Sequence, residues 1–457
     1  MLERRWQKTR VTHLRGPLMR MFHRPLRNRP GSPGRVLTAL AMLLGLAWLA
    51  GGGSTAFAAQ PLRLKLTVKA GQYDRQDTPI SVPITVPADL AKVTSVTLVD
   101  EQGNKLPGQV TAPSLLDQRG DDAQGGTART LHFVLPRLKA GQQTTLVAAI
   151  PGETAETATR WNHADKQYAE LVAGERPVLR YMCAPLDPKK REQTYKVFHH
   201  LYDPTGQQLV TKGPGGRFTH HRGLFYGFNR VSYGDGKHNV DVWHCSRDAH
   251  QSHDGFLAEE AGPVLGRHLL AVGWHGDEGK TFAEETRELT AYLVPQGQLI
   301  EFASRLQTKV GPIKLDGDPQ HAGFHFRASN EVADSTAKQT YYLRPDGKGA
   351  LGATRNWSAG SRDPKTVNLP WNAMSFVLGD QRYTAVYLDH PANPKEARYS
   401  ERDYGRFGSY FEYTVEENRP LEVKYRVVLR QGELTVEEAQ QLHTDFVHPV
   451  EVEVSQP

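Results

Sequence analysis

From Gln60 onwards, apolar and polar residues alternate along short segments of the chain. Residues 62–68 read Leu-Arg-Leu-Lys-Leu-Thr-Val, and similar segments follow at 93–99, 131–135 and 144–150. A period of two places the apolar side chains on one face of a β-strand. Polar turns separate these segments, and no helical stripe of useful length accompanies them. The sequence therefore predicts an all-β fold.

The density of these segments divides the chain into parts. Short strands over residues 60–150 predict a small β-sandwich, and residues 151–164, which are poor in large apolar residues, predict a linker. Residues 165–450 hold longer, aromatic-rich strands and are too many for one immunoglobulin-type sandwich. We expect them to form a large sandwich of two antiparallel sheets packed face to face. The one convincing helix begins after Thr435, whose capping-box partner is Glu438.

The N-terminus has the three-part pattern of a secretory signal. Nine arginines and one lysine lie in residues 1–35 against one glutamate, an uncharged apolar run covers 36–50, and small residues lead to Ala58. The apolar run is shorter than the roughly 20 residues that span a bilayer, although an uncleaved anchor is an alternative. We expect residues 1–58 to be a signal peptide, and the protein to be periplasmic or extracellular with no stable membrane span after cleavage.

The charge of the chain depends on this leader. Residues 1–58 carry ten positive charges and one negative charge, a net charge of +9, so their removal changes the net charge of the chain from +6 to about −3. The sequence therefore indicates no nucleic-acid partner. Two cysteines, Cys183 and Cys245, remain after export. They form one disulfide or stay as two buried thiols, and the sequence leaves both alternatives open.

Ten of the nineteen histidines fall between His199 and His275. Histidine titrates near neutrality and is the commonest metal ligand, so we expect the functional site in this stretch. Its core contains His220-His221-Arg222-Gly223 and, further on, Trp243. Neighbouring residues on a strand point to opposite faces, so one histidine of the pair is expected to face a pocket.

A metal site is a weaker prediction. His244, His250 and His253 have a spacing that a turn can close on zinc or copper. The stretch lacks the paired histidines and glutamate of a zinc-peptidase helix, and a polar histidine-rich loop explains it more simply. We therefore predict no cofactor, and keep metal binding as an alternative.

Two later segments carry further candidates. In residues 316–327, His321 and His325 would line one face of a strand with Arg327 beyond them. Residues 399–413 combine aromatic rings, glycines and alternating charges, which suits a sugar site. Glu412 lies between Phe411 and Tyr413 in this segment, so we expect burial to raise its pKa and fit it for acid–base chemistry.

Several long phrases in residues 176–446 resemble a family of secreted bacterial proteins that carries the transferred label "methane oxygenase PmoA". The phrases are Arg-Pro-Val-Leu-Arg-Tyr (176–181), Gly-Pro-Gly-Gly (213–216), His-His-Arg-Gly-Leu-Phe (220–225), Ala-Gly-Pro-Val-Leu-Gly-Arg-His (261–268), Leu-Asp-Gly-Asp-Pro-Gln-His-Ala-Gly-Phe-His-Phe-Arg (315–327) and Glu-Arg-Asp-Tyr-Gly-Arg-Phe-Gly-Ser-Tyr-Phe (401–411). A genuine methane oxygenase subunit crosses the membrane many times, whereas this chain has one apolar run, so we discard that activity.

The same resemblance points to galactose-mutarotase-like sandwiches, which act on sugars with a histidine acid and a carboxylate base. It implies His325 or His321 as the acid and Glu412 as the base, with His221 and Arg222 steadying the sugar. Shared fold alone does not establish function.

Three hypotheses follow. The preferred one is an exported carbohydrate-active enzyme that isomerises or cleaves a sugar or other small polar substrate; the alternatives are a metal-dependent hydrolase or oxygenase using the histidines of residues 220–253, and a non-catalytic carbohydrate-binding protein. The predicted catalytic residues are His325, Glu412 and His221. The predicted substrate-binding residues are Arg222, His321, Arg327, Trp243, Asp403, Tyr404 and Arg406.

Overall fold

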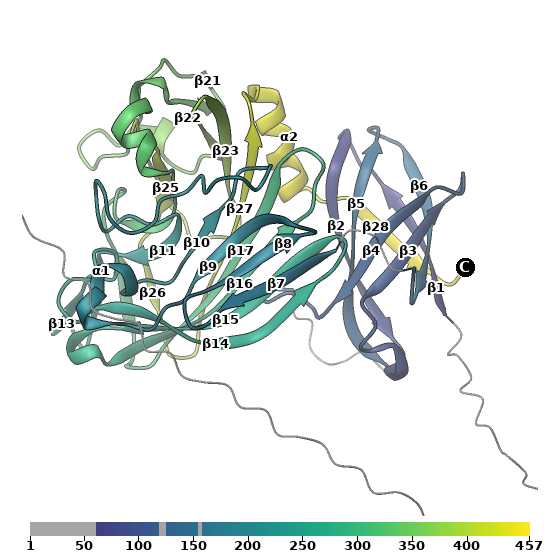
Figure 1. Cartoon of the computed structure of the whole chain (residues 1–457), viewed down its shortest axis with the longest axis horizontal. Helices are drawn as coiled ribbons and strands as arrows, with labels where there is room; N and C mark the ends of the chain where they lie inside the picture. Colours follow the sequence, from purple (N-terminus) through teal and green to yellow (C-terminus); the bar gives the residue numbers. More distant parts are fainter. Residues whose placement is uncertain (1–60, 118–124, 154–157) are drawn as a thin grey trace, which may run out of the picture. The chain divides into compact units, whose positions relative to one another are not determined.

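The fold is built almost wholly from antiparallel strands, as the alternation predicts (Figure 1). The computed structural model describes residues 61–117, 125–153 and 158–457, and the chain from Ala59 onwards forms one compact unit. The predicted signal peptide, residues 1–58, lies outside the described residues. Within them, the only α-helices are α1 (Arg191–Thr194) and α2 (Val436–Val447). No described helix is long and apolar enough to cross a membrane.

The first sheet has seven strands in the order β2-β5-β4-β3-β6-β1-β28. Alternate residues of its strands, such as Leu66, Val82 and Phe133, are buried in one shared core. The last strand of the chain completes this sheet by pairing with the first, with Lys65 opposite Ser455. The strands are β1 (Leu62–Lys69), β2 (Arg75–Val86), β3 (Ser95–Asp100), β4 (Lys105–Thr111), β5 (Thr127–Leu138), β6 (Gln143–Ile150) and β28 (Glu451–Ser455).

The second sheet has eight strands in the order β24-β25-β19-β11-β10-β9-β8-β7. Its edge strand β7 begins at Thr159, inside the segment expected to be a linker. The linker prediction is therefore wrong for residues 159–164, where Trp161 stacks on the buried ring of His268 at 4.6 Å. The strands are β7 (Thr159–Ala164), β8 (Tyr168–Ala173), β9 (Arg176–Met182), β10 (Phe198–Leu201), β11 (Leu224–Phe228), β19 (Ala322–Arg327), β24 (Arg398–Arg402) and β25 (Arg406–Tyr410).

The third sheet has nine strands in the order β14-β15-β16-β17-β27-β23-β22-β20-β21 and packs face to face against the second. Phe302 of the third sheet stacks on Phe324 of the second, with ring centroids 4.4 Å apart. The large two-sheet sandwich is thereby confirmed. The strands are β14 (His250–Ala261), β15 (Leu265–His275), β16 (Thr281–Tyr292), β17 (Gln298–Thr308), β20 (Tyr341–Arg344), β21 (Gly347–Lys348), β22 (Trp371–Leu378), β23 (Gln381–Asp389) and β27 (Leu421–Gln431).

Other elements cover the outer faces of this sandwich. Helix α2 has the predicted capping box of Thr435 and Glu438 and packs Phe446 into a core with Trp371 of the third sheet. Loops lie over the second sheet, where Trp243 packs on Phe225 of β11. A small sheet in the order β13-β12-β18-β26 completes the fold. Its strands are β12 (Arg230–Tyr233), β13 (His238–Val240), β18 (Ile313–Asp316) and β26 (Tyr413–Val415).

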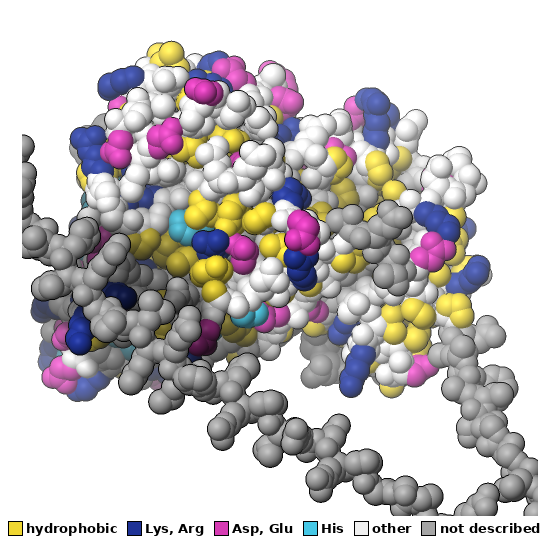
Figure 2. Space-filling view, in the orientation of Figure 1, with side chains coloured by type: hydrophobic (Ala, Val, Ile, Leu, Met, Phe, Trp, Pro, Cys, Tyr) yellow, Lys and Arg dark blue, Asp and Glu magenta, His cyan; other side chains and the backbone are white. Residues whose placement is uncertain are grey.

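Acidic and basic side chains are interspersed on the face of the molecule that Figure 2 shows. Interspersed charges of both signs create no strong directional field. The charges that bear most on function are instead the buried ones, described below.

Burial of histidines makes the stability of the fold depend on pH. His200 on β10 is buried, and its Nδ1 lies 3.0 Å from Thr211 Oγ1. Burial, helped by the charge of Arg180, lowers the pKa of His200 to about 3. The same histidine in the unfolded chain has a pKa of about 6.5. Between about pH 6.5 and 3, His200 is therefore protonated in the unfolded chain but neutral in the folded chain.

We expect stability to fall as the pH drops below about 6.5. This one residue should account for about 3 kcal/mol of unfolding free energy between pH 6.5 and 4. A His200→Gln variant should show a correspondingly shallower pH dependence in urea unfolding, whereas the exposed His238→Gln control should not. Equal pH slopes in wild type and His200→Gln would contradict this assignment.

Candidate metal centre

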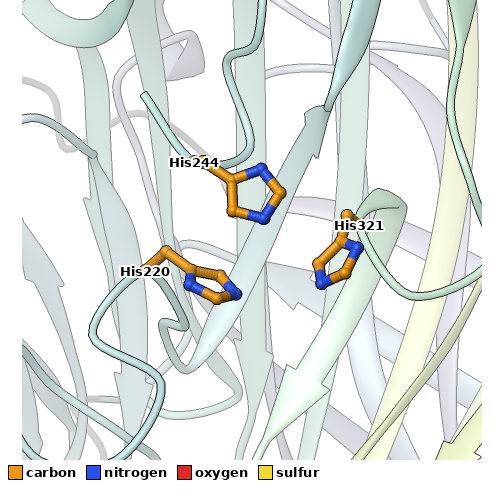
Figure 3. A group of neighbouring side chains, drawn as sticks. All are labelled: His220, His244 and His321. Carbon is orange, nitrogen blue, oxygen red and sulfur yellow. The ribbon is translucent and has the colours of Figure 1, made fainter. Parts of the chain in front are cut away.

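Three histidines from three separate loops converge on one point (Figure 3). His220 precedes β11, His244 lies between β13 and β14, and His321 directly precedes β19. One ring nitrogen from each lies within 4.8 Å of the other two. Nitrogens this near to one another can ligate a single cation after a small approach of the rings, since metal–nitrogen distances are about 2.0–2.1 Å.

Two of the three histidines, His244 and His321, are each positioned by a turn of the same kind in their own loop. Asp241 Oδ1 accepts hydrogen bonds from the backbone N–H groups of Trp243, at 3.0 Å, and His244, at 2.7 Å. Asp318 Oδ1 accepts from Gln320 N at 2.9 Å. In both loops an aspartate three residues before the histidine closes the turn, which is a common use of this side chain.

The two aspartates also orient the imidazole rings. His244 Nδ1 lies 2.8 Å from Asp241 Oδ2, and His321 Nδ1 lies 3.0 Å from Asp318 Oδ1. Because a carboxylate accepts, each Nδ1 carries the proton and each Nε2 keeps a lone pair for a ligand. Burial raises the pKa of both aspartates, but the hydrogen bonds that each carboxylate accepts from its histidine and from the backbone outweigh burial, so both pKa values are lowered.

His220 completes the set with a nitrogen that has no other use. Its Nε2 is buried and forms no hydrogen bond with any residue that the structure describes. The buried Lys196 Nζ donates to the backbone carbonyls of both His220 and Trp243 and thereby joins two of the loops. Burial lowers the pKa of this lysine to about 7.

The residues therefore fit a divalent cation such as zinc. Three neutral imidazoles with a carboxylate behind two of them form the ligand set of catalytic zinc sites, which keep a fourth position open. The side chains of His244 and His321 are 32% and 26% exposed, so the centre is open to solvent.

The sequence also suggested His250 and His253 as metal ligands, and this prediction is wrong. His250 stacks on His275 with ring centroids 4.1 Å apart. His253 packs against Tyr181, and its Nδ1 lies 3.3 Å from the tyrosine hydroxyl. Both residues lie on β14, where pairing with β15 directs their side chains to partners away from the centre.

Several predicted site residues do gather beside the centre. The ring of His221 is 4.4 Å from that of His220, and Arg327 Nε donates to His221 Nδ1 at 3.3 Å. The ring of His325 is 4.8 Å from Trp243, and its Nδ1 is 3.2 Å from Arg406 Nη1. Burial is the main cause that lowers the pKa of both histidines.

Three other residues that were predicted to bind substrate lie in different surroundings. Arg222 donates to the backbone carbonyls of Thr219, His221 and Glu192, so it supports a loop. Tyr404 stacks near Phe218 at 4.6 Å and lies 6.2 Å from His221, at the edge of the site. Its neighbour Asp403 forms an ion pair with Lys338 at 3.0 Å.

Glu412 does not have the buried setting expected for it. Its side chain is 42% exposed and pairs with Arg398 at 2.5 Å. The neighbouring Phe411 is buried, and both residues lie in the short connection between β25 and β26. None of the contacts that Glu412 forms with described residues involves a histidine of the centre.

The cysteines have a definite state in the structure. Cys183 and Cys245 are both free and buried. Burial raises the pKa of each thiol to about 11, so neither is a reactive thiolate.

The fold and the site together define a β-sandwich protein with a three-histidine centre. The chain belongs to DUF6807, a family of unknown function, whose model matches residues 168–444. That description carries no methane-oxygenase label. No curated protein matches the chain.

Two solved structures are similar over most of this chain. One is an alpha-mannosidase from Enterococcus faecalis V583, with 9% identity, a TM-score of 0.41, and coverage of 86% of this chain and 46% of that one. The other is a protein in the glycosyl hydrolase family 38 from Enterococcus faecalis, with 8% identity, a TM-score of 0.43, and coverage of 87% and 48%. The chain spans about half the length of each. Similarity this slight assigns neither a substrate nor a reaction.

Proposed function

We propose that this protein is a metal-dependent hydrolytic enzyme whose reaction centre is formed by His220, His244 and His321. The observation that carries the proposal is the orientation of two imidazoles by Asp241 and Asp318, which leaves their Nε2 lone pairs directed to a shared point. A polar loop without a ligand does not require this arrangement.

The residues of the centre have separate roles in metal binding and in orienting the ligands. The three histidines would hold the cation, and the two aspartates keep the rings of His244 and His321 in the tautomer that binds metal. If bound there, a zinc ion would supply Lewis acidity at the open position between the histidines, and a water bound to it would have a pKa of about 7. The partial exposure of His244 and His321 leaves room for substrate and water to approach.

The carbohydrate hypothesis remains a prediction about the substrate. Its acid–base pair, His325 with Glu412, receives no support from the contacts of Glu412, which is exposed and paired with Arg398. We keep sugars among the substrates to be tested, and export remains part of the proposal.

Hydrolysis of p-nitrophenyl acetate tests this function, with p-nitrophenyl glycosides run in parallel. We expect the zinc-loaded protein to turn over at least one of these probes, a chelator to abolish turnover, and added zinc to restore it. Turnover that survives complete removal of metal would contradict the proposal. So would a zinc-loaded protein that is inactive on every acyl and glycosyl probe.

A further inference from the structure

His221 and His325 flank the metal centre but present the opposite chemistry to its ligands. Arg327 Nε donates to His221 Nδ1 at 3.3 Å, and Arg406 Nη1 lies 3.2 Å from His325 Nδ1. A guanidinium group has no acceptor, so both Nδ1 atoms must accept. A neutral imidazole then carries its proton on Nε2. Both rings therefore present an N–H donor where the ligands of the centre present a lone pair.

These two donor histidines lie next to the ligands. The rings of His221 and His220 are 4.4 Å apart. Trp243 connects the other side, with its ring 4.8 Å from His325 and 6.3 Å from His321. The ring of His221 thus contacts a ligand directly, whereas Trp243 lies between His325 and the ligand His321.

Several buried groups beside the centre lack a hydrogen-bond acceptor. Four polar groups here are buried and have no hydrogen-bond partner among the described residues. They are Trp243 Nε1, Arg327 Nη2, Arg406 Nε and His325 Nε2. The first three are N–H donors by nature, and the fourth is one by the argument above. Such groups call for an acceptor, because a buried donor left without one is destabilising.

The buried positive charges beside the centre also lack partners of opposite charge. Arg327 and Arg406 sit directly opposite each other on β19 and β25, and each is about 1% exposed. Like charges opposite each other across a sheet are destabilising. Among the described residues, these two arginines and the buried Lys196 bind backbone carbonyls and uncharged side chains, and none of the three forms an ion pair. The nearby Asp241 and Asp318 are already held by histidines.

We infer that the substrate carries an oxyanion, such as a carboxylate, sulfate or phosphate group, that binds on the donor side of the metal centre. An oxyanion supplies several hydrogen-bond acceptors for the unpartnered donors and a negative charge for the unpaired arginines. This inference rests on the proposed function in so far as it makes the oxyanion part of a substrate. The donor groups themselves do not depend on a metal.

Calorimetric titration with glucuronate, glucose, acetate, sulfate and inorganic phosphate tests the inference. Glucuronate and glucose share a sugar ring, and only glucuronate has a carboxylate. We expect the wild-type protein to bind glucuronate at least tenfold more tightly than glucose, with or without zinc. The three simple anions identify which oxyanion fits best.

Charge-neutral variants locate the binding groups. Arg327→Gln and Arg406→Gln should each weaken glucuronate binding at least tenfold, while Arg398→Gln, a control from the same sheet, should leave it unchanged. If an arginine variant fails to fold, as judged by circular dichroism, the comparison of glucuronate with glucose in wild type still decides the matter.

The zinc-loaded and zinc-free titrations separate the two claims. Zinc binding together with equal affinities for glucuronate and glucose would overturn the oxyanion inference and leave the proposed function standing. Anion binding that requires zinc and ignores both arginine variants would also overturn it. Tight anion binding by a protein that takes up no zinc would support the inference and contradict the proposed function.

Discussion

Replacing His244 by alanine is expected to weaken zinc binding at least about 1000-fold, more than the 10–100-fold typical of losing an outer partner of a ligand. The variant keeps only two imidazoles, and two ligands do not make a stable zinc site. Competition with a fluorescent zinc chelator measures the change. Turnover of any substrate that the wild type hydrolyses should fall with it.

The exposed His238 offers a matched control for this substitution. It lies in the same histidine-rich stretch, and its Nδ1 pairs with Asp277 at 3.0 Å. His238→Ala should bind zinc as wild type does. Zinc affinity that is unchanged in His244→Ala would remove this residue from the ligand set.

Replacing Asp318 by asparagine is expected to weaken zinc binding by about 10–100-fold. Asparagine keeps the size of the side chain but loses the charge that favours the Nδ1–H tautomer of His321. The ring then presents its Nε2 lone pair less often. The same competition assay measures the loss, and circular dichroism checks the fold.

Asp277→Asn is the corresponding control, because Asp277 holds an exposed histidine in the same way and lies outside the centre. It should leave zinc affinity unchanged. Equal effects of Asp318→Asn and Asp277→Asn would mean that the carboxylate behind His321 does not act through a metal ligand.

The sequence predicted the architecture well because a strand exposes its two faces alternately. The buried Leu64, Leu66 and Val68 of β1 are the apolar positions of the first alternating segment. The pairing of β1 with β28 could not be predicted in this way. Lys65 and Ser455 belong to opposite ends of the chain, and a period-two pattern does not encode which distant strand is the partner.

The site was only partly predictable. The crowding of histidines pointed to His221 and Trp243, and the strand pattern to His325, all of which lie beside the centre. Sequence reasoning identified His244 as a possible metal ligand but missed His321, although each has an aspartate three residues earlier in its loop. His220 had no such signal, because only the tertiary fold brings its loop to the other two.

The expectation for Glu412 was wrong because aromatic neighbours in the sequence do not determine whether a side chain is buried. Phe411 and Glu412 lie in the short connection between β25 and β26. Phe411 is buried there, whereas Glu412 is exposed and pairs with Arg398. Period-two alternation describes strands, so it does not apply to this connection.

The zinc K-edge X-ray absorption spectrum of the zinc-loaded protein tests the central claim most directly. We expect one zinc ion per chain with three imidazole nitrogens at about 2.0–2.1 Å and one further light ligand. We expect the imidazole signal to be lost in His244→Ala. A spectrum with no imidazole scattering, or one that is identical in wild type and His244→Ala, would contradict a centre built from His220, His244 and His321.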